Sequence, residues 1–167
     1  MIRSGDALPS VPVKLITAEG VSDATSTDVL GAGKVVFFAV PGAFTPTCDT
    51  SHLPGFVAAA DRIKALGVSR IVCGSVNDHH VMKAWAERSE ALDKIDFLAD
   101  PAAEFAKAIG LAKDNPGLGG TRFARFAMIL NDGIVEDLFV QDVAGVTVSG
   151  APAIILALEG QDASISA

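Results

Sequence analysis

Cysteine is scarce in this sequence, and the patterns that cysteine builds in other proteins are absent. The 167 residues include two cysteines, Cys48 and Cys73. Two cysteines are too few for a disulfide scaffold, and the sequence contains neither a CxxC pair nor a Cys/His ligand set. The sequence therefore argues against a structural zinc site, and it disfavours a thiol-disulfide oxidoreductase, which needs a second cysteine beside the first.

The sequence also lacks an excess of basic residues and any long apolar run. Its formal net charge is −7, whereas binding to nucleic acid or to an anionic membrane surface depends on positive charge. No apolar stretch approaches the roughly 20 residues that span a bilayer, and the N-terminus has no signal-peptide core. We therefore expect a soluble, cytoplasmic protein with neither a nucleic acid nor a membrane as partner.

The remaining composition is that of an ordinary globular protein. Hydrophobic residues make up 50% and charged residues 20% of the chain, a balance that does not favour long disordered stretches. A chain of this length can bury a core without staples, so we expect one domain over residues 1–167.

Apolar runs and helix signals alternate along the chain. The unbroken apolar run of residues 34–40 predicts a central strand buried on both faces. The other expected elements are an edge strand over 11–16, a polar connector over 17–28, helices over 56–66, 77–92 and 100–110, strands over 70–76 and 95–99, a mobile loop over 113–120, a β-hairpin over 123–140, a final helix over 153–158 and a frayed tail over 159–167. The helix over 56–66 is expected to bury one apolar stripe, Phe56, Ala59, Ala60, Ile63 and Leu66, and Asn77 is expected to cap the helix that follows it. This order predicts a thioredoxin-like α/β fold with a central mixed sheet flanked by helices.

Cys48 lies at the start of the helix that follows the central strand. Thr45 and Pro46 form an N-cap and first-position pair, which places Cys48 in the first helical turn. The positive end of the helix dipole favours a thiolate there. The neighbouring Asp49 opposes a second negative charge unless its side chain points into solvent. The alternative is that Cys48 is a small buried hydrophobe.

A proline at position 54 is expected to interrupt this helix.

Four further side chains can be interpreted either as part of a site or as structural residues. Arg125 lies in an apolar run, where a guanidinium either meets an anion, such as a thiolate or an acidic substrate group, or extends to water. His52 follows Cys48 by one helical turn and is either a base for the thiol or a structural residue. Arg122 is expected to be solvated, and Cys73 is expected to be a core residue that does not form an obligatory disulfide with Cys48.

A longer pattern surrounds Cys48. Pro41, Thr45 and Cys48 fit P-x-x-x-[TS]-x-x-C, and the segments PGAFTP (41–46) and HLPGF (52–56) extend it. Further matching segments are VND (76–78), LADP (98–101), RF (125–126) and DGIV (132–135). With these segments the sequence resembles a peroxiredoxin, and most closely the peroxiredoxin 5 subfamily, over nearly its whole length.

The resemblance implies a thiol peroxidase of thioredoxin-like fold that reduces hydrogen peroxide and alkyl hydroperoxides to water or alcohol. It implies that Cys48 attacks the peroxide, that Thr45 hydrogen-bonds the thiolate and the peroxide, and that Pro41 shields the site. Arg125 would stabilise the thiolate and polarise the O–O bond, and Phe44 would help to bind the substrate. No metal, haem or other cofactor is required, and a homodimer is expected.

One departure from the family pattern concerns the second half-reaction. Members that resolve internally carry a late cysteine in the segment that corresponds to residues 146–152, and this chain has none there. We therefore expect an external thiol, either glutathione with glutaredoxin or thioredoxin, to reduce the Cys48 sulfenic acid. A different interpretation is a non-catalytic peroxide sensor or redox-regulated binding protein, which would consume peroxide once rather than turn over.

Overall fold

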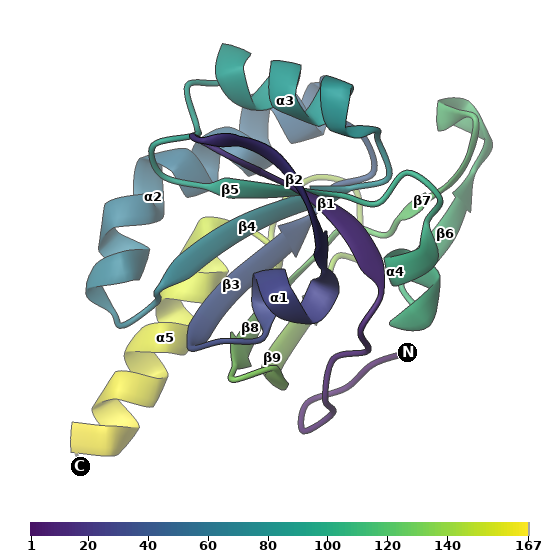
Figure 1. The fold of residues 1–167 in the computed structure, drawn as a ribbon. Helices are drawn as coiled ribbons and strands as arrows, with labels where there is room; N and C mark the ends of the chain where they lie inside the picture. Colours follow the sequence, from purple (N-terminus) through teal and green to yellow (C-terminus); the bar gives the residue numbers. More distant parts are fainter. Residues whose placement is uncertain (167) are drawn as a thin grey trace.

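A mixed sheet forms the centre of the computed structural model, which describes the backbone of residues 1–166 and the side chains of residues 1–161 (Figure 1). Across this sheet the strands are, in order, β2 (Gly20–Thr25), β1 (Pro12–Thr17), β5 (Asp96–Ala99), β4 (Arg70–Ser75), β3 (Lys34–Ala39), β8 (Phe126–Asn131) and β9 (Ile134–Val140). Strands β3, β4 and β5 are parallel neighbours, and the other pairings are antiparallel. The predicted central mixed sheet and the closing hairpin are confirmed.

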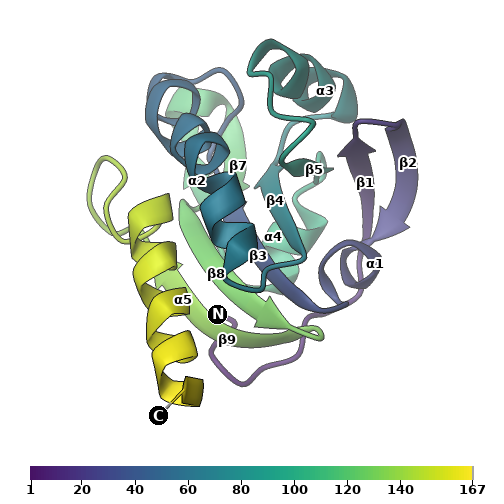
Figure 2. The same cartoon turned by 90° about the vertical axis from the view of Figure 1, so that its left-hand side faces the viewer.

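Helices cover both faces of this sheet. The described helices are α1 (Ser26–Leu30), a π-helical turn (Cys48–His52), α2 (Leu53–Ala65), α3 (His79–Arg88), α4 (Glu104–Ala108), a short 3-10 turn (Pro116–Leu118) and α5 (Ala151–Ser166). Figure 2 shows α2, α3 and α5 on one face, where they pack on Val36 and Phe38 of β3. Helices α1 and α4 pack on the other face, against Val35 and Phe37. The alternation along β3 explains why its sequence is apolar at every position.

The N-terminal region contains more regular structure than the sequence predicts. The strand expected at the edge is β1, but β2 pairs with its outer side, and α1 follows at once. Strand β2 and the first three residues of α1 lie in the segment 17–28 expected to be a polar connector. Strand β2 is largely exposed, so it lacks the apolar alternation that marks a strand. Helix α1 is held by a capping box between Thr25 and Asp28.

The segment 113–120 is not the mobile loop that its composition predicts. Strand β6 (Ala112–Asn115) pairs antiparallel with β7 (Gly120–Phe123), and the 3-10 turn joins them. Lys113, Asp114 and Thr121 of this ribbon are exposed, so the sequence shows no apolar strand pattern there. Gly119 and Gly120 have φ of 88° and 139°, which glycine adopts without strain.

The chain around Pro54 is continuous, contrary to the predicted break. Helical backbone runs from Pro46 through the π-helical turn directly into α2. Pro54 lies in the first turn of α2, and the wider π turn lets the Leu53 N–H donate to the Cys48 carbonyl. Along α2, Phe56, Ala60 and Ile63 are fully buried, which confirms the predicted apolar stripe.

Three other helix boundaries also differ from the predictions. Helix α3 is capped by the carboxylate of Asp78, not by Asn77, and ends at Arg88 rather than near 92. Helix α4 starts at Glu104, because Asp100 uses its carboxylate to accept from the Phe105 and Ala106 N–H groups. Helix α5 continues to Ser166 through most of the tail expected to fray, and residue 167 lies outside the described part of the chain.

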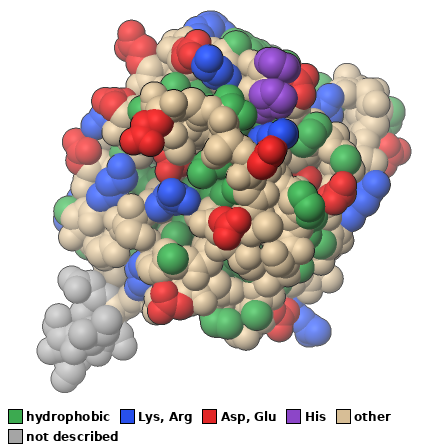
Figure 3. Space-filling view, viewed as in Figure 1, with side chains coloured by type: hydrophobic (Ala, Val, Ile, Leu, Met, Phe, Trp, Pro, Cys, Tyr) green, Lys and Arg blue, Asp and Glu red, His purple; other side chains and the backbone are tan. Residues whose placement is uncertain are grey.

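Figure 3 shows that acidic and basic side chains are interspersed on the face that it presents, with no extended basic area. Among the described helices, none has both the length and the apolar character needed to cross a membrane.

Candidate active site

The loop between β3 and the helix of Cys48 is anchored to Asn77, in the segment that follows β4. The Ala43 N–H donates to Asn77 Oδ1 at 2.9 Å, and the same oxygen accepts from the buried Ser75 hydroxyl at 2.6 Å. The loop turns tightly: Phe44 has φ of 63°, and a Cβ on Gly42 would lie 3.1 Å from Thr45 Cγ2. Asn77 therefore anchors the loop that precedes the cysteine, and sequence reasoning assigned it a cap instead.

Cys48 occupies the first turn of the helix, as predicted, and is almost completely covered. Helical backbone begins at Pro46, and the Asp49 N–H donates to the Thr45 carbonyl at 2.8 Å. Cys48 is 1% exposed and starts the π-helical turn, a distortion that is common at functional sites. An ionised sulfur in such a covered position needs a partner that carries positive charge.

Arg125 supplies that positive charge. It lies between β7 and β8, and its Nη2 donates to Cys48 Sγ at 3.0 Å. Its Nη1 lies 2.7 Å from His52 Nδ1. A planar guanidinium can make both contacts at once, and this bidentate arrangement fixes its orientation. The interpretation in which Arg125 extends to water does not describe this structure.

His52 is hydrogen-bonded to Arg125 and not to Cys48 Sγ. The imidazole is 1% exposed, and its Nε2 lies 2.8 Å from the Ser149 carbonyl. A carbonyl can only accept, so Nε2 carries the proton and Nδ1 offers its lone pair to Arg125. Burial, assisted by the charge of Arg125, lowers the pKa of His52 to about 4. The imidazole is therefore neutral near pH 7. Its unprotonated nitrogen, Nδ1, accepts from Arg125 and so does not serve as a base for the Cys48 thiol.

This burial makes a prediction for stability. In the unfolded chain His52 takes up a proton near its ordinary pKa of 6.5, whereas in the folded protein its pKa is about 4. Because the unfolded state binds more protons in this window, the free energy of unfolding falls as the pH falls from 6.5 toward 4, by about 3 kcal/mol in all. Urea unfolding of the wild type and His52→Gln at about pH 7 and about pH 4.5 measures this loss.

His52→Gln lacks the titrating group, so its stability changes less over the same pH window. The exposed His80 provides the control, and His80→Gln keeps the wild-type pH dependence. Equal pH dependence in all three proteins would contradict the assignment of a neutral, buried His52.

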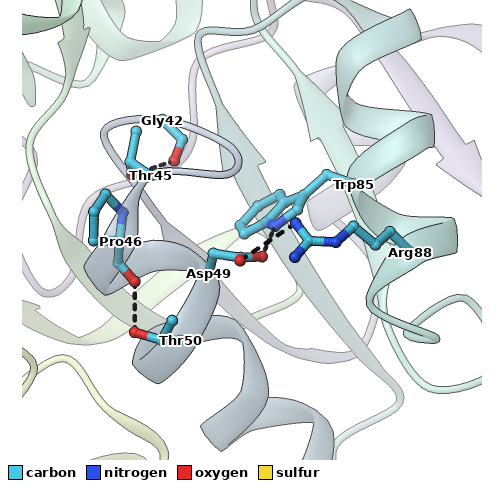
Figure 4. Close-up of polar contacts among 7 residues, drawn as sticks. All are labelled: Gly42, Thr45, Pro46, Asp49, Thr50, Trp85 and Arg88. Atoms are coloured by element: carbon cyan, nitrogen blue, oxygen red, sulfur yellow. Dashed lines mark hydrogen bonds and ion pairs between the residues drawn. The ribbon is translucent and has the colours of Figure 1, made fainter.

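The carboxylate of Asp49 is partly buried against α3 and does not extend freely into solvent. Its carboxylate accepts from Trp85 Nε1 at 2.8 Å and from Arg88 Nη1 at 3.4 Å (Figure 4). Arg88 also lies over the ring of Phe44, 5.4 Å from its centroid, and Phe44 is 40% exposed. The negative charge beside Cys48 is thus compensated by α3.

Thr45 does not act as the N-cap hydroxyl that the sequence predicts. Its Oγ1 donates to the Gly42 carbonyl at 2.6 Å (Figure 4), and it retains lone pairs that can accept from a bound molecule. Pro41 is half-buried at the start of the same loop. Pro41 and Thr45 thus both lie in the loop that leads into the helix of Cys48. Of the predicted polar side chains, the one that contacts the sulfur is Arg125.

The two remaining predicted residues, Cys73 and Arg122, have other surroundings and partners. Cys73 is 0% exposed in β4, as expected for a core residue; burial raises the pKa of its thiol, and both cysteines are free thiols. Arg122 is half-buried rather than solvated, because it donates to the Leu118 carbonyl at 2.7 Å. Among the described residues, no three His, Cys, Asp or Glu side chains are gathered as a metal site.

Comparison with known proteins identifies many relatives over nearly the whole chain. The family model described as Redoxin matches residues 3–155. Peroxiredoxin-2C of Oryza sativa subsp. japonica is 42% identical over 94% of this chain and 98% of its own. The crystal structure of reduced Prx3 from Vibrio vulnificus in complex with H2O2 is 44% identical, with a TM-score of 0.91 over 97% of this chain and 99% of that one. Peroxiredoxin 5 from Alvinella pompejana is 30% identical, with a TM-score of 0.83 over 96% and 100%.

The thioredoxin-like fold and the arginine-held thiol at the start of a helix define a thiol-based redox protein. The comparisons specify which kind. The chain belongs to the Redoxin family and is a peroxiredoxin, a thiol-dependent peroxidase. The predicted fold class and the predicted class of enzyme are confirmed.

Proposed function

We propose that Cys48 is the residue that attacks the peroxide, with Arg125, Thr45, Pro41 and Phe44 around it. The observation that carries this assignment is the 3.0 Å contact between Arg125 Nη2 and Cys48 Sγ in a covered position. The guanidinium stabilises the thiolate and, when peroxide is bound, the charge that develops on its oxygens. Thr45 accepts a hydrogen bond from the peroxide, Pro41 shields the sulfur from water, and the exposed Phe44 contacts the substituent of the substrate.

The proposed reaction consumes one peroxide and two thiols. The Cys48 thiolate attacks one peroxide oxygen, so that an S–O bond forms and the O–O bond breaks. The other oxygen leaves with a proton as water or alcohol, the sulfur is oxidised to sulfenic acid, and the peroxide is reduced by two electrons. One thiol then forms a mixed disulfide with Cys48 and releases water. A second thiol attacks this disulfide, which restores the Cys48 thiolate and releases the two external thiols joined as a disulfide.

We further propose that the substrates are hydrogen peroxide and alkyl hydroperoxides and that the chain is of the peroxiredoxin 5 type. The similarity to Prx3 from Vibrio vulnificus, whose crystal structure is a complex with H2O2, supports the first proposal. The likeness to peroxiredoxin 5 from Alvinella pompejana supports the second. A cytoplasmic homodimer remains our proposal for the working form of the protein.

The proposed reductant is an external thiol, either glutathione with glutaredoxin or thioredoxin. The segment 146–152 contains no cysteine. Cys73 is the other cysteine of the chain, and it is completely buried in β4, between β3 and β5. Both cysteines are free thiols in the structure, and the backbone of Cys73 is held by strand pairing on both sides.

This proposal predicts the product of oxidation. When the reduced protein is treated with peroxide in the absence of thiol, Cys48 accumulates as sulfenic acid, because no second thiol reaches it. Mass spectrometry after trapping with dimedone measures the modified fraction, which is the major product in both the wild type and Cys73→Ala. Turnover resumes on addition of glutathione with glutaredoxin or of thioredoxin. A disulfide between Cys48 and Cys73 as the dominant product would overturn the external step while leaving the peroxidase assignment intact.

A further inference from the structure

The segment between β9 and α5 is folded around the side chain of Gln141. Its Oε1 accepts from the Thr147 N–H at 3.0 Å, the Ser149 N–H at 3.4 Å and the Ser149 hydroxyl at 3.0 Å. Its Nε2 donates to Thr147 Oγ1 at 2.7 Å and to the Val143 carbonyl at 3.2 Å. One amide group thus joins the beginning of this loop to its end.

Both ends of this loop lead to Arg125. At the beginning, the Gln141 N–H donates to the Arg125 carbonyl at 2.9 Å. At the end, Ser149 is 0% exposed and its carbonyl accepts from His52 Nε2 at 2.8 Å. His52 Nδ1 in turn accepts from the Arg125 guanidinium at 2.7 Å. Gln141 is therefore bonded directly to the backbone of Arg125. It is also linked, through Ser149, to His52, the residue that orients the Arg125 side chain.

We propose that Gln141 is a positioning residue for Arg125: it holds the Ser149 carbonyl where His52 must donate to it, and so presents the lone pair of His52 to the guanidinium on Cys48. The proposal rests on the proposed roles of Cys48 and Arg125, and it adds a residue that contacts neither the sulfur nor a substrate. Within the loop of residues 141–149, which carries no resolving cysteine, this role belongs to Gln141 and to the Ser149 backbone that it holds.

The surroundings of His52 explain why its acceptor matters. Strand β3 and helix α2 present the rings of Phe38 and Phe56, with centroids 5.0 Å and 5.6 Å away, and these rings offer the imidazole no acceptor. The charged and titratable groups near it are Arg125 and, one helical turn earlier, Cys48. If the Ser149 carbonyl moves away, Nε2 loses its partner. The ring can then turn or take up a proton on Nδ1, and either change removes the lone pair that holds Arg125.

Three variants separate this role from a general effect on structure. Gln141→Leu keeps the size of the side chain and the backbone bond to Arg125, but removes every side-chain hydrogen bond. Gln141→Glu keeps an acceptor for Thr147 and Ser149. Val143→Ala changes an exposed side chain of the same loop and is the control. The measurement is the single-turnover rate of peroxide consumption by the prereduced proteins between about pH 5 and about pH 8, which needs no added reductant.

We expect Gln141→Leu to be slower by about tenfold at pH 7, with a deficit that grows as the pH falls below about 6.5, because a released His52 protonates near its ordinary pKa of 6.5. Gln141→Glu and Val143→Ala stay within about threefold of the wild type. A rate for Gln141→Leu that equals the wild-type rate, or that is lower by the same factor at every pH, would overturn the proposal. So would a Gln141→Glu variant as slow as Gln141→Leu.

A second measurement uses the wild-type protein alone, so it holds even where Gln141→Leu fails to fold. Nitrogen NMR of histidine-labelled protein reports which ring nitrogen of His52 carries the proton. We expect the Nε2–H form throughout the range from about pH 5 to about pH 8. A proton on Nδ1, or titration of His52 near 6.5, would overturn the inference. A wild-type protein that shows this NMR signature but consumes no peroxide would instead refute the proposed function of the site.

Discussion

Replacing Cys48 by serine lowers the rate of peroxide consumption by at least about 10³-fold, to the background of the uncatalysed reaction. The serine hydroxyl fits the space of the thiol, and Arg125 remains in place beside it. A hydroxyl, however, remains protonated at neutral pH, and it lacks the polarisable electron pair with which a thiolate attacks an oxygen atom. The measurement is the steady rate of peroxide loss with excess thiol reductant, accompanied by urea unfolding to show that the variant is folded.

Cys73→Ala is the matched control for this experiment. It removes the other thiol from a fully buried position of the same apolar cluster, so it lowers stability by about 1 kcal/mol but keeps the wild-type rate within about twofold. Consumption of many equivalents of peroxide by the wild type and by Cys73→Ala, but not by Cys48→Ser, is the expected pattern. Undiminished turnover by Cys48→Ser would place the chemistry elsewhere, and a single equivalent consumed by the wild type would favour a sensor.

The position of the cysteine could be predicted from sequence because local rules determine it. An apolar strand, a tight loop and a proline at the first helical position are all encoded within a few residues of Cys48, so its place in the first turn follows from them. The contact with Arg125 joins residues far apart in the chain. The sequence could only indicate that a guanidinium in an apolar run needs an anion, and the register of β3 with β8 decides which anion lies within reach.

The residues around that contact were harder to predict because their roles depend on long-range partners. The spacing of His52 from Cys48 indicated a shared helix face, but the roles of Gln141 and Ser149 depend on a loop that closes over this face from the far end of the sheet. The cap predicted for Thr45 was wrong because its hydroxyl can bond either an N–H of the first helical turn or the carbonyl of Gly42, three residues earlier. Local propensity does not decide between them, and in the structure the hydroxyl donates to Gly42. The missed strands β2 and β6 have no buried side chain, and β7 has one, Phe123, so these strands lack the apolar alternation that marks a strand in the sequence.

Replacing Arg125 produces the second large loss of activity. Arg125→Met keeps an unbranched, half-buried side chain but removes the charge and both hydrogen bonds, and we expect the rate of peroxide consumption to fall by about 10²–10³-fold. Arg125→Lys keeps the charge. A single ammonium cannot contact Cys48 Sγ and His52 Nδ1 in the fork that the guanidinium forms, so this variant loses about tenfold or more. The single-turnover rate at about pH 7 measures both effects.

Arg70→Met separates the loss of this particular guanidinium from the loss of any half-buried arginine. Arg70 is the first residue of β4, at the end of the strand opposite to Ser75 and the Cys48 loop. There it contacts Asp96 at 3.1 Å and the Val29 carbonyl at 2.9 Å. Its replacement lowers stability but leaves the rate within about threefold of the wild type, because Cys48 keeps its partner. If Arg125→Met reacted with peroxide as fast as Arg70→Met, the sulfur would have to be activated by the helix start alone, and the guanidinium would serve only to fill its place between β7 and β8.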